Sequence, residues 1–356
     1  MCDMTIEQQP KNTGLSQEFQ IQMDVLEVDQ GEMMTRVFLV ALLSLTCVSQ
    51  GIGSGTIAFV RDNAVYVSDA RSDQSRRVPN SQGAFIASIS PGGEYLVFFT
   101  GSSQNPHGYF CQTPFSECLT LKVPSKVVYG LIWAGTGNRF FLGQQAASVL
   151  VSLPGMEFKA YRYFPSSISA DGRTLAYATH SQVRVEIEGK ERTVFAIPKT
   201  AKPINWTFGG ITLSRDGRQL FFASNLGNGI ARSGTTHWRW FVVNTDAGEP
   251  TALQLPEFTG RLPDTVEISS DNKKMVFGFS NQYASTIYLL NFVQNELRTL
   301  YQNKNGALSA IFSPDSNFLA IASNTLQNGK LVSRVEITNL NGIVQRSIPG
   351  ASQCTW

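Results

Sequence analysis

Residues 168–177, Ile-Ser-Ala-Asp-Gly-Arg-Thr-Leu-Ala-Tyr, decide the fold of this chain. An apolar residue leads into a short Asp-Gly corner, and three consecutive apolar residues follow shortly after it. An Asp side chain bonds to the amides of a turn and Gly tolerates a positive φ, so the corner is typical of a tight antiparallel hairpin. Three consecutive apolar residues indicate a strand covered on both faces. This stretch predicts a hairpin whose second strand lies inside a stack of sheets.

The same pattern occurs six times along the chain. The spacings between successive corners are 44, 35, 45, 55 and 44 residues, which is close to the period of a four-stranded β-propeller blade. We therefore predict an all-β chain folded as a β-propeller of four-stranded blades. The six corners are centred on Gly92, Thr136, Asp171, Asp216, Asp271 and Asp315.

The two ends of the repeat region complete one further blade. Residues 56–59, 64–67 and 76–79 read as the second, third and fourth strands of a blade whose first strand is missing. Residues 351–356 supply that first strand, because Trp356 stands where an apolar residue precedes each corner. Pairing of the C-terminal strand with the N-terminal strands closes the ring and leaves no free sheet edge. Seven blades are preferred, and six are the alternative if the 35-residue repeat is not a blade.

These motifs resemble the propeller repeats of the TolB-like, or WD40-like PD40, family. The hallmark of that family is a Ser-Pro-Asp-Gly corner followed by a Leu-Ala-Phe-like strand. The resemblance covers about residues 55–356, and the corners at Gly92 and Thr136 depart from it because they lack Asp. It implies a closed propeller and leaves the identity of any partner open.

The segment that precedes the propeller has the pattern of a secretory signal peptide. Arg36 is followed by a run of apolar residues that ends in small residues near Ser49. The run is shorter than the roughly 20 residues that a membrane span needs. We expect residues 34–49 to be a signal peptide and residues 50–356 to be a single propeller domain, periplasmic or secreted. The alternatives are an N-terminal helix packed on the ring and a signal anchor.

Residues 1–33 form an acidic, polar extension that is unusual before a signal peptide. We interpret them as disordered, or as an extension that is not translated, with translation beginning at Met33 or Met34. Residues 1–49 contain seven acids and two bases, so the chain's net charge of +2 becomes +7 for residues 50–356. Nucleic-acid binding is nevertheless disfavoured, because an exported chain rarely meets nucleic acid and no basic run is interleaved with aromatic residues. Lipidation of Cys47 is a less favoured alternative.

Cysteine usage agrees with export. Cys111 and Cys118 flank six residues, so they are a candidate disulfide within one blade. The alternative is a pair of free thiols on neighbouring strands. Their spacing is unlike that of a zinc site.

Catalytic motifs are not evident in the sequence. It contains no Gly-x-Ser-x-Gly elbow, phosphate-binding loop or His-Glu-x-x-His motif. The histidines, His107, His180 and His237, fall in different repeats. We expect no catalytic residues, no cofactor and no metal, and we assign the corner aspartates to turn hydrogen bonds rather than to calcium. Trp238 and Trp240 are expected to pack between blades. A hydrolase or lyase acting on a glycan or peptide is the alternative, and it requires carboxylates or histidines that converge in the central funnel.

Three long polar connections point to a binding surface. Residues 224–236, 101–108 and 324–330 each connect a second strand to a third, on the face opposite the corners, which we call the loop face. Long connections on a rigid scaffold often carry recognition, although tolerated surface insertion is the alternative. We expect a monomer that binds a protein or an envelope component through this face. We expect it to contact the membrane only through its signal or an anchor. Arg215 and Arg218 should lie on the opposite surface, the corner face. The candidate partner-binding residues are Asn105, His107, Asn225, Asn228, Arg232, Asn328 and Lys330.

Overall fold

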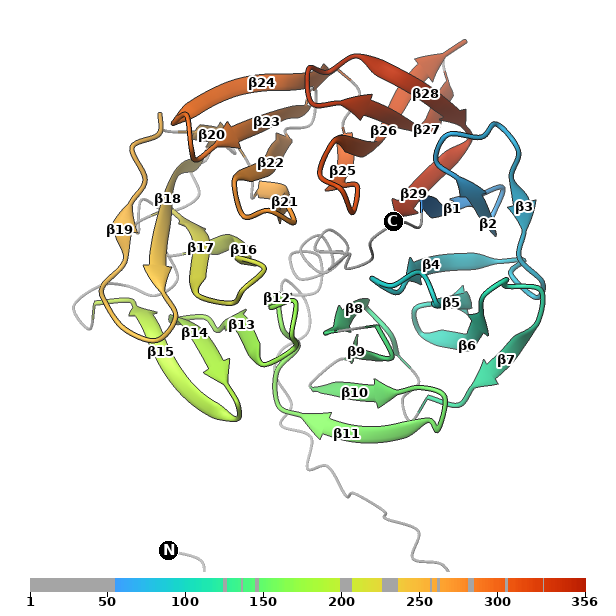
Figure 1. Cartoon of the computed structure of the whole chain (residues 1–356), viewed down its shortest axis with the longest axis horizontal. Helices are drawn as coiled ribbons and strands as arrows, with labels where there is room; N and C mark the ends of the chain where they lie inside the picture. The colour runs from blue at the N-terminus through green and yellow to red at the C-terminus, as the bar shows by residue number, and fades with distance from the viewer. Residues whose placement is uncertain are drawn as a thin grey trace, which may run out of the picture.

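The computed structural model describes residues 55–356 except 124–126, 136, 145–146, 199–206, 226–235, 257, 261–262, 281–284, 305–306 and 329. Within this part the chain forms 29 strands in seven antiparallel sheets, arranged as the blades of a ring (Figure 1). No helix occurs among the described residues, and hence none that is long and apolar enough to cross a membrane. The predicted all-β propeller is confirmed.

Each blade runs from an inner first strand to an outer fourth strand. Blade 1 contains β29 (Ala351–Thr355), β1 (Thr56–Arg61), β2 (Ala64–Asp69) and β3 (Arg76–Arg77). Blade 2 contains β4 (Ala84–Ile89), β5 (Tyr95–Ser102), β6 (Asn105–Gln112) and β7 (Cys118–Leu121). Blade 3 contains β8 (Gly130–Ala134), β9 (Arg139–Gly143), β10 (Ser148–Ser152) and β11 (Glu157–Tyr161). Blade 4 contains β12 (Ser167–Ile168), β13 (Thr174–Ala178), β14 (Gln182–Ile187) and β15 (Lys190–Ala196).

The remaining three blades follow the same order. Blade 5 contains β16 (Phe208–Leu213), β17 (Gln219–Ser224), β18 (Thr236–Asn244) and β19 (Thr251–Ala252), and β20 (Phe258–Gly260) also pairs with β18. Blade 6 contains β21 (Pro263–Ile268), β22 (Lys274–Ser280), β23 (Ser285–Asn291) and β24 (Glu296–Asn303). Blade 7 contains β25 (Ala307–Phe312), β26 (Phe318–Gln327), β27 (Lys330–Asn339) and β28 (Val344–Pro349).

The C-terminal strand closes the ring as predicted. β29 pairs with β1, and Cys354 lies opposite Phe59 in their register. Trp356 is buried in one apolar cluster with Phe59 and Ile311, so it belongs to the core rather than to a loose tail. The 35-residue repeat forms the complete blade β8–β11, so seven blades are correct and the six-blade alternative is wrong.

The apolar core lies between neighbouring blades. Strands such as Tyr95–Ser102 and Gln219–Ser224 bury several consecutive residues, because a blade covers each of their faces. Trp238 and Trp240 are buried, and the Trp240 ring lies 5.1 Å from that of Phe277 in the next blade. The predicted packing of these tryptophans is confirmed.

Polar side chains of the inner strands also join neighbouring blades. Thr355 Oγ1 accepts a hydrogen bond from the Ile89 amide at 3.0 Å, and Ser167 Oγ accepts one from the Leu213 amide at 2.9 Å. Thr355 and Ser167 each stand one residue before the apolar residue at the end of an inner first strand, Trp356 and Ile168. These bonds link the inner strands of blade 1 to blade 2 and of blade 4 to blade 5.

Candidate functional site

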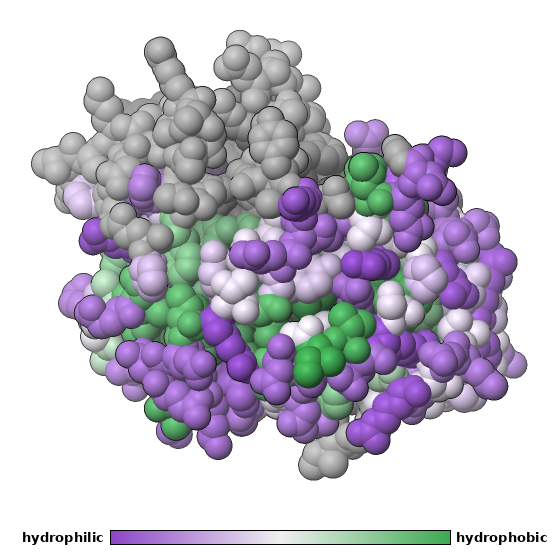
Figure 2. Space-filling model, turned by 90° about the horizontal axis from the view of Figure 1, so that it is seen from above, coloured by the Kyte–Doolittle hydropathy of each residue, from purple (hydrophilic) through white to green (hydrophobic). Residues whose placement is uncertain are grey.

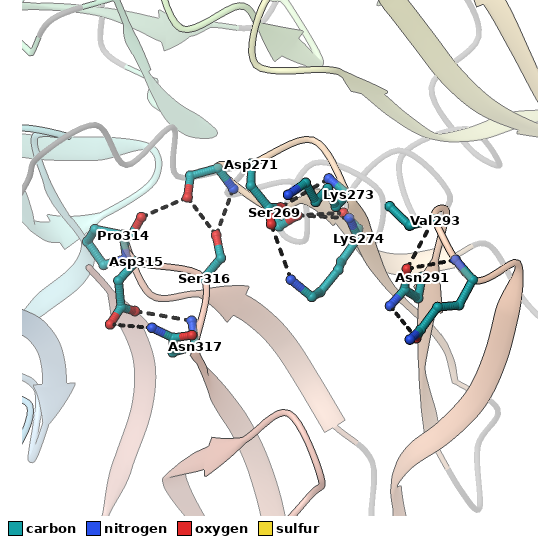
Figure 3. Close-up of polar contacts among 12 residues, drawn as sticks. Ser269, Asp271, Lys273, Lys274, Asn291, Val293, Pro314, Asp315, Ser316 and Asn317 are labelled. Carbon is teal, nitrogen blue, oxygen red and sulfur yellow. Dashed lines mark hydrogen bonds and ion pairs between the residues drawn. The ribbon is translucent and has the colours of Figure 1, made fainter.

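The corners are closed by a repeated side-chain arrangement. In four of them a serine donates to the aspartate two residues later, and the serine oxygen accepts from the amide five residues after itself. At the blade 6 corner these distances are 2.5 Å from Ser269 Oγ to Asp271 Oδ1 and 2.9 Å from the Lys274 amide to Ser269 Oγ (Figure 3). Asp171, Asp216 and Asp315 accept in the same way from Ser169, Ser214 and Ser313. The predicted turn hydrogen bonds are confirmed.

Neighbouring corners are also bonded to one another. The Ala170 amide donates to the Arg215 carbonyl at 2.8 Å, and the Arg215 amide donates to Asn272 Oδ1 at 2.6 Å. The corners of blades 6 and 7 are also in contact, because Ser270 Oγ and Ser316 Oγ lie 2.6 Å apart. Figure 3 labels Ser316 on the blade 7 side of this contact. The inner part of the corner face is therefore occupied by contacts within the protein.

These hydrogen bonds stabilise the ionised form of three corner aspartates, Asp171, Asp271 and Asp315. Partial burial opposes ionisation, but the bonds from Ser169 and the Arg173 amide, with the Arg173 charge, hold the pKa of Asp171 below its ordinary value. The pKa values of Asp271 and Asp315 are lowered in the same manner. Each aspartate serves its own turn, and no group of three or more metal-ligating side chains occurs in the described part of the chain.

A buried carboxyl group lies on an inner strand of blade 6. Glu267 is almost fully buried, and burial raises its pKa to about 8 against the opposing effects of the Phe312 amide and the Arg215 charge. The Phe312 amide donates to Glu267 Oε2 at 2.5 Å. Among the described side chains of the first strands it is the only carboxylate, and histidine is absent from these strands. Sequence reasoning missed this group, although a Glu between Val266 and Ile268 was a signal for it.

The side chain of Arg215 is not the surface charge that we predicted for the corner face. We expected a surface charge there, but its Nη1 atom is buried, and burial lowers the pKa of the guanidinium despite the nearby Glu267. The side chain lies at the junction between blades 5 and 6, which a linear sequence does not reveal. Arg218 is exposed, as expected.

The loop face differs from its prediction in an important respect. Residues 101–108 and 324–330 are not long loops, because the second and third strands continue through them to tight turns. Gly101 pairs with Pro106 in blade 2, and Leu326 pairs with Leu331 in blade 7. Cross-strand pairing thus overrides the loop-like composition of these segments.

The blade 7 hairpin extends beyond its sheet. The pairing of β26 with β25 ends at Ser323, and that of β27 with β28 ends at Arg334. Residues 324–327 and 330–333 therefore form a two-stranded projection, which we call the ribbon. Leu326 and Leu331 near its tip are 59% and 64% exposed, so an apolar pair faces solvent there.

Polar contacts brace the base of the ribbon against blade 6. Tyr301 Oη lies 2.8 Å from Glu336 Oε2 and 3.1 Å from Ser323 Oγ. The Asn303 side chain donates to the Asn324 carbonyl at 2.7 Å. Burial, together with the charge of Glu336, raises the pKa of Tyr301. The contacts join β24 to β26 and β27, so the ribbon has a fixed base.

The structure separates the candidate binding residues into three groups. Asn105, His107, Asn328 and Lys330 are exposed on the loop face. Asn225 is buried and its Oδ1 accepts from the Thr207 amide at 2.9 Å, so its expected role as a surface contact is wrong. Asn228 and Arg232 lie outside the described residues.

Two further features agree with blade geometry. Cys111 and Cys118 lie opposite each other on β6 and β7 and form a disulfide.

His107, His180 and His237 come from three blades, but the topology places all of them at loop-face ends of strands, where they are exposed. The histidines therefore share a surface that their sequence positions did not suggest.

Charge is distributed unequally between the two faces. We counted the described connections on each face together with the strand residues that flank them. The corner face has 13 acids and nine bases, whereas the loop face has six bases and one acid. The loop-face bases are Arg61, Arg77, Lys122, Arg162, Lys304 and Lys330, and the acid is Asp62.

Known proteins resemble this chain in fold. No family model matches it, and no curated protein shows significant sequence similarity. A structure of prolyl endopeptidases is similar at TM-score 0.58 and 12% identity, covering 90% of this chain and 52% of that one. Oligogalacturonate lyase in complex with manganese matches at TM-score 0.55 and 14% identity, covering 78% and 82%. TolB from Acinetobacter baumannii matches at TM-score 0.49 and 14% identity, covering 85% and 67%.

At these identities the similarity concerns the propeller fold alone. The chain spans about half the length of the prolyl endopeptidases. The similar structures also carry the names of proteins with different activities. The function of this chain must therefore be argued from its own residues.

Proposed function

We propose that this protein is an exported, non-catalytic, TolB-like propeller that binds a protein or another envelope component through its loop face. The observation that carries the proposal is the ribbon, with its exposed Leu326 and Leu331. An apolar pair held in solvent by a braced hairpin offers a contact that a partner would bury favourably. On the corner face, by contrast, neighbouring turns at the inner ends of the blades are bonded to one another.

The ribbon has a matched control in the same blade. Ile343 and Val344, in the turn between β27 and β28 and at the start of β28, are also exposed, at 59% and 45%, but they lie on the corner face. Figure 2, which views the rim that carries β24 and β28, shows separate apolar areas on a mostly hydrophilic surface. Exposed apolar side chains alone therefore do not distinguish the faces, and the test must compare the two pairs.

The test is a crosslinking pull-down from intact envelopes of the native host with the full chain. We expect a defined protein adduct that is lost in Leu326→Ser/Leu331→Ser and kept in Ile343→Ser/Val344→Ser. Both variants remove two exposed apolar side chains, so folding should be affected equally. Loss of the adduct only in the corner-face variant would contradict the proposal.

Export is tested separately, because it rests on residues 34–49. N-terminal mass spectrometry of protein from the native host should find a mature chain that begins near Gln50. Recovery of residues 1–40 in the exported protein would contradict a cleaved signal peptide.

An enzyme acting on a glycan or peptide is the second candidate, and Glu267 is the observation that favours it. A carboxyl group that is protonated near neutral pH is a feature of general acids. The hydrogen bond that Glu267 accepts from the Phe312 amide, however, also explains the buried carboxyl group as a structural contact between blades 6 and 7. The test is turnover of glycan or peptide libraries by the full chain. Turnover that is abolished in a folded Glu267→Gln variant would establish that the protein is an enzyme.

A further inference from the structure

The excess of positive charge on the loop face indicates what kind of surface this face binds. From the described residues we infer that the loop face docks on an anionic lipid membrane, with the tip of the ribbon placed among the headgroups. This inference rests on the loop face being the binding surface, and it goes beyond the proposed protein or envelope partner by naming the lipid bilayer itself.

The distribution of the cations favours a lipid surface over an acidic protein. Arg77, Lys122 and Arg162 come from blades 1, 2 and 3, Lys330 comes from the neighbouring blade 7, and Lys304 lies in the connection from blade 6 to blade 7. They are exposed and spread over the face rather than gathered in one groove. A layer of mobile anionic headgroups can neutralise scattered cations, whereas a folded protein would need acids at matching positions. Each Lys or Arg near such a surface contributes about 1 kcal/mol of attraction.

The ribbon supplies an apolar contact next to positive charge. Lys330 lies directly before Leu331 and pairs with Gln327 across the ribbon. Lys304 follows Asn303, whose side chain is bonded to the Asn324 carbonyl, so a second cation lies near the base of the ribbon. Leucine and lysine side chains together at a projecting tip suit the boundary between headgroups and acyl chains.

The opposite face orients the molecule. The excess of acids over bases on the corner face would be repelled by anionic lipid, while the loop face is attracted. The exposed pair Ile343 and Val344 lies on this acidic side, so electrostatic steering selects the ribbon over the corner-face pair. Among the described residues, net positive charge and exposed apolar side chains therefore occur together on the loop face and not on the corner face.

Vesicle co-sedimentation of the full chain tests the inference. The probes are phosphatidylcholine vesicles with and without about one third phosphatidylglycerol, which give a negative and a neutral surface. The readout is the ratio of partition coefficients between the two vesicle types. The apolar segment 37–49 is identical in all variants, so it does not affect their comparison.

We expect the wild type to prefer anionic vesicles and to lose this preference at high salt. Lys304→Gln/Lys330→Gln should lower the ratio about 30-fold, following the attraction of each cation. Leu326→Ser/Leu331→Ser should weaken binding to anionic vesicles about tenfold through lost apolar contact. Arg218→Gln/Lys273→Gln removes two exposed charges from the corner face and should change the ratio less than twofold.

Equal partitioning of the wild type to both vesicle types overturns the inference, as does an equal loss in the corner-face variant. If vesicles are not bound but the ribbon variant still loses a protein adduct in envelopes, the partner is a protein and the proposed function stands. If the ribbon variant keeps both the vesicle binding and the protein adduct, the inference and the proposed function fail together.

Discussion

The two faces of this propeller are built from the same kind of hairpin connection but differ in how regular these connections are. On the corner face, short turns repeat one serine-aspartate arrangement and bond to their neighbours. On the loop face, the hairpins differ in length, and the ribbon projects beyond its sheet. Repetition of a turn indicates a structural role, because every blade must meet the same neighbour. Departure from the repeat, together with positive charge, indicates a surface that is free to bind.

The largest expected effect on stability comes from deleting the C-terminal strand, which closes the ring that carries both faces. Deleting residues 351–356 removes β29 and the buried Trp356, and it exposes the edge of β1. We expect a melting temperature at least about 10 °C lower, with aggregation, because the loss includes a core strand. Differential scanning calorimetry measures the change in melting temperature. An unchanged melting curve would show that the ring does not depend on this closure.

A pH-dependent effect comes next, at the junction of blades 5 and 6. The folded-state pKa of Glu267 is raised to about 8, above the ordinary value of 4.5. Its neutral form is favoured in the folded state, so this contribution to stability is fully present below pH 4.5 and is lost as pH rises through 8. Glu267→Gln stays neutral, so its stability relative to the wild type should improve by roughly 4 kcal/mol between pH 5 and pH 9.

Urea unfolding of both proteins at several pH values measures this difference. Glu267→Asp, which still titrates, serves as a control for the pH dependence. A constant difference between wild type and Glu267→Gln across the range would mean that Glu267 is ionised in the folded protein at all these pH values.

A smaller effect should separate the turns of the two faces. Ser269→Ala removes a buried hydroxyl that donates to Asp271 and accepts from Lys274, and should cost about 1–2 kcal/mol of unfolding free energy. Ser102 also accepts an amide hydrogen bond, from Asn105 on the loop face, but it is exposed. Ser102→Ala should therefore cost less than about 0.5 kcal/mol. Equal costs in denaturant titrations would remove the distinction between a structural and a free face.

The smallest stability change is expected for the ribbon itself. Replacing residues 325–332 with a two-residue turn leaves Asn324 and Ser333, and with them the contacts at the ribbon's base. Loop length on a scaffold contributes little to stability, so the melting temperature should shift by no more than about 2 °C. Binding to envelopes should be lost in the same protein. A large fall in the melting temperature would instead assign the ribbon a role in folding.

The sequence predicts the corner face far better than the loop face. The corner at Asp171 depends on residues within one turn, so local chemistry identifies it, and repetition extends the prediction around the ring. The segment 101–108 contains Gly, Ser, Asn and Pro and reads as a loop, but its two halves pair as strands. The burial of Asn225 and of Arg215 Nη1 likewise depends on surrounding structure that the linear sequence does not reveal.

Photo-crosslinking at two positions of blade 7 tests the central claim most directly. Leu331 on the loop face and Ile343 on the corner face are exposed to similar extents, 64% and 59%, so a photoreactive amino acid at either should be equally accessible. Irradiated in envelopes of the native host, the full chain should form an adduct from position 331 and none from position 343. An adduct from position 343 alone, or equal adducts from both, would contradict recognition through the loop face.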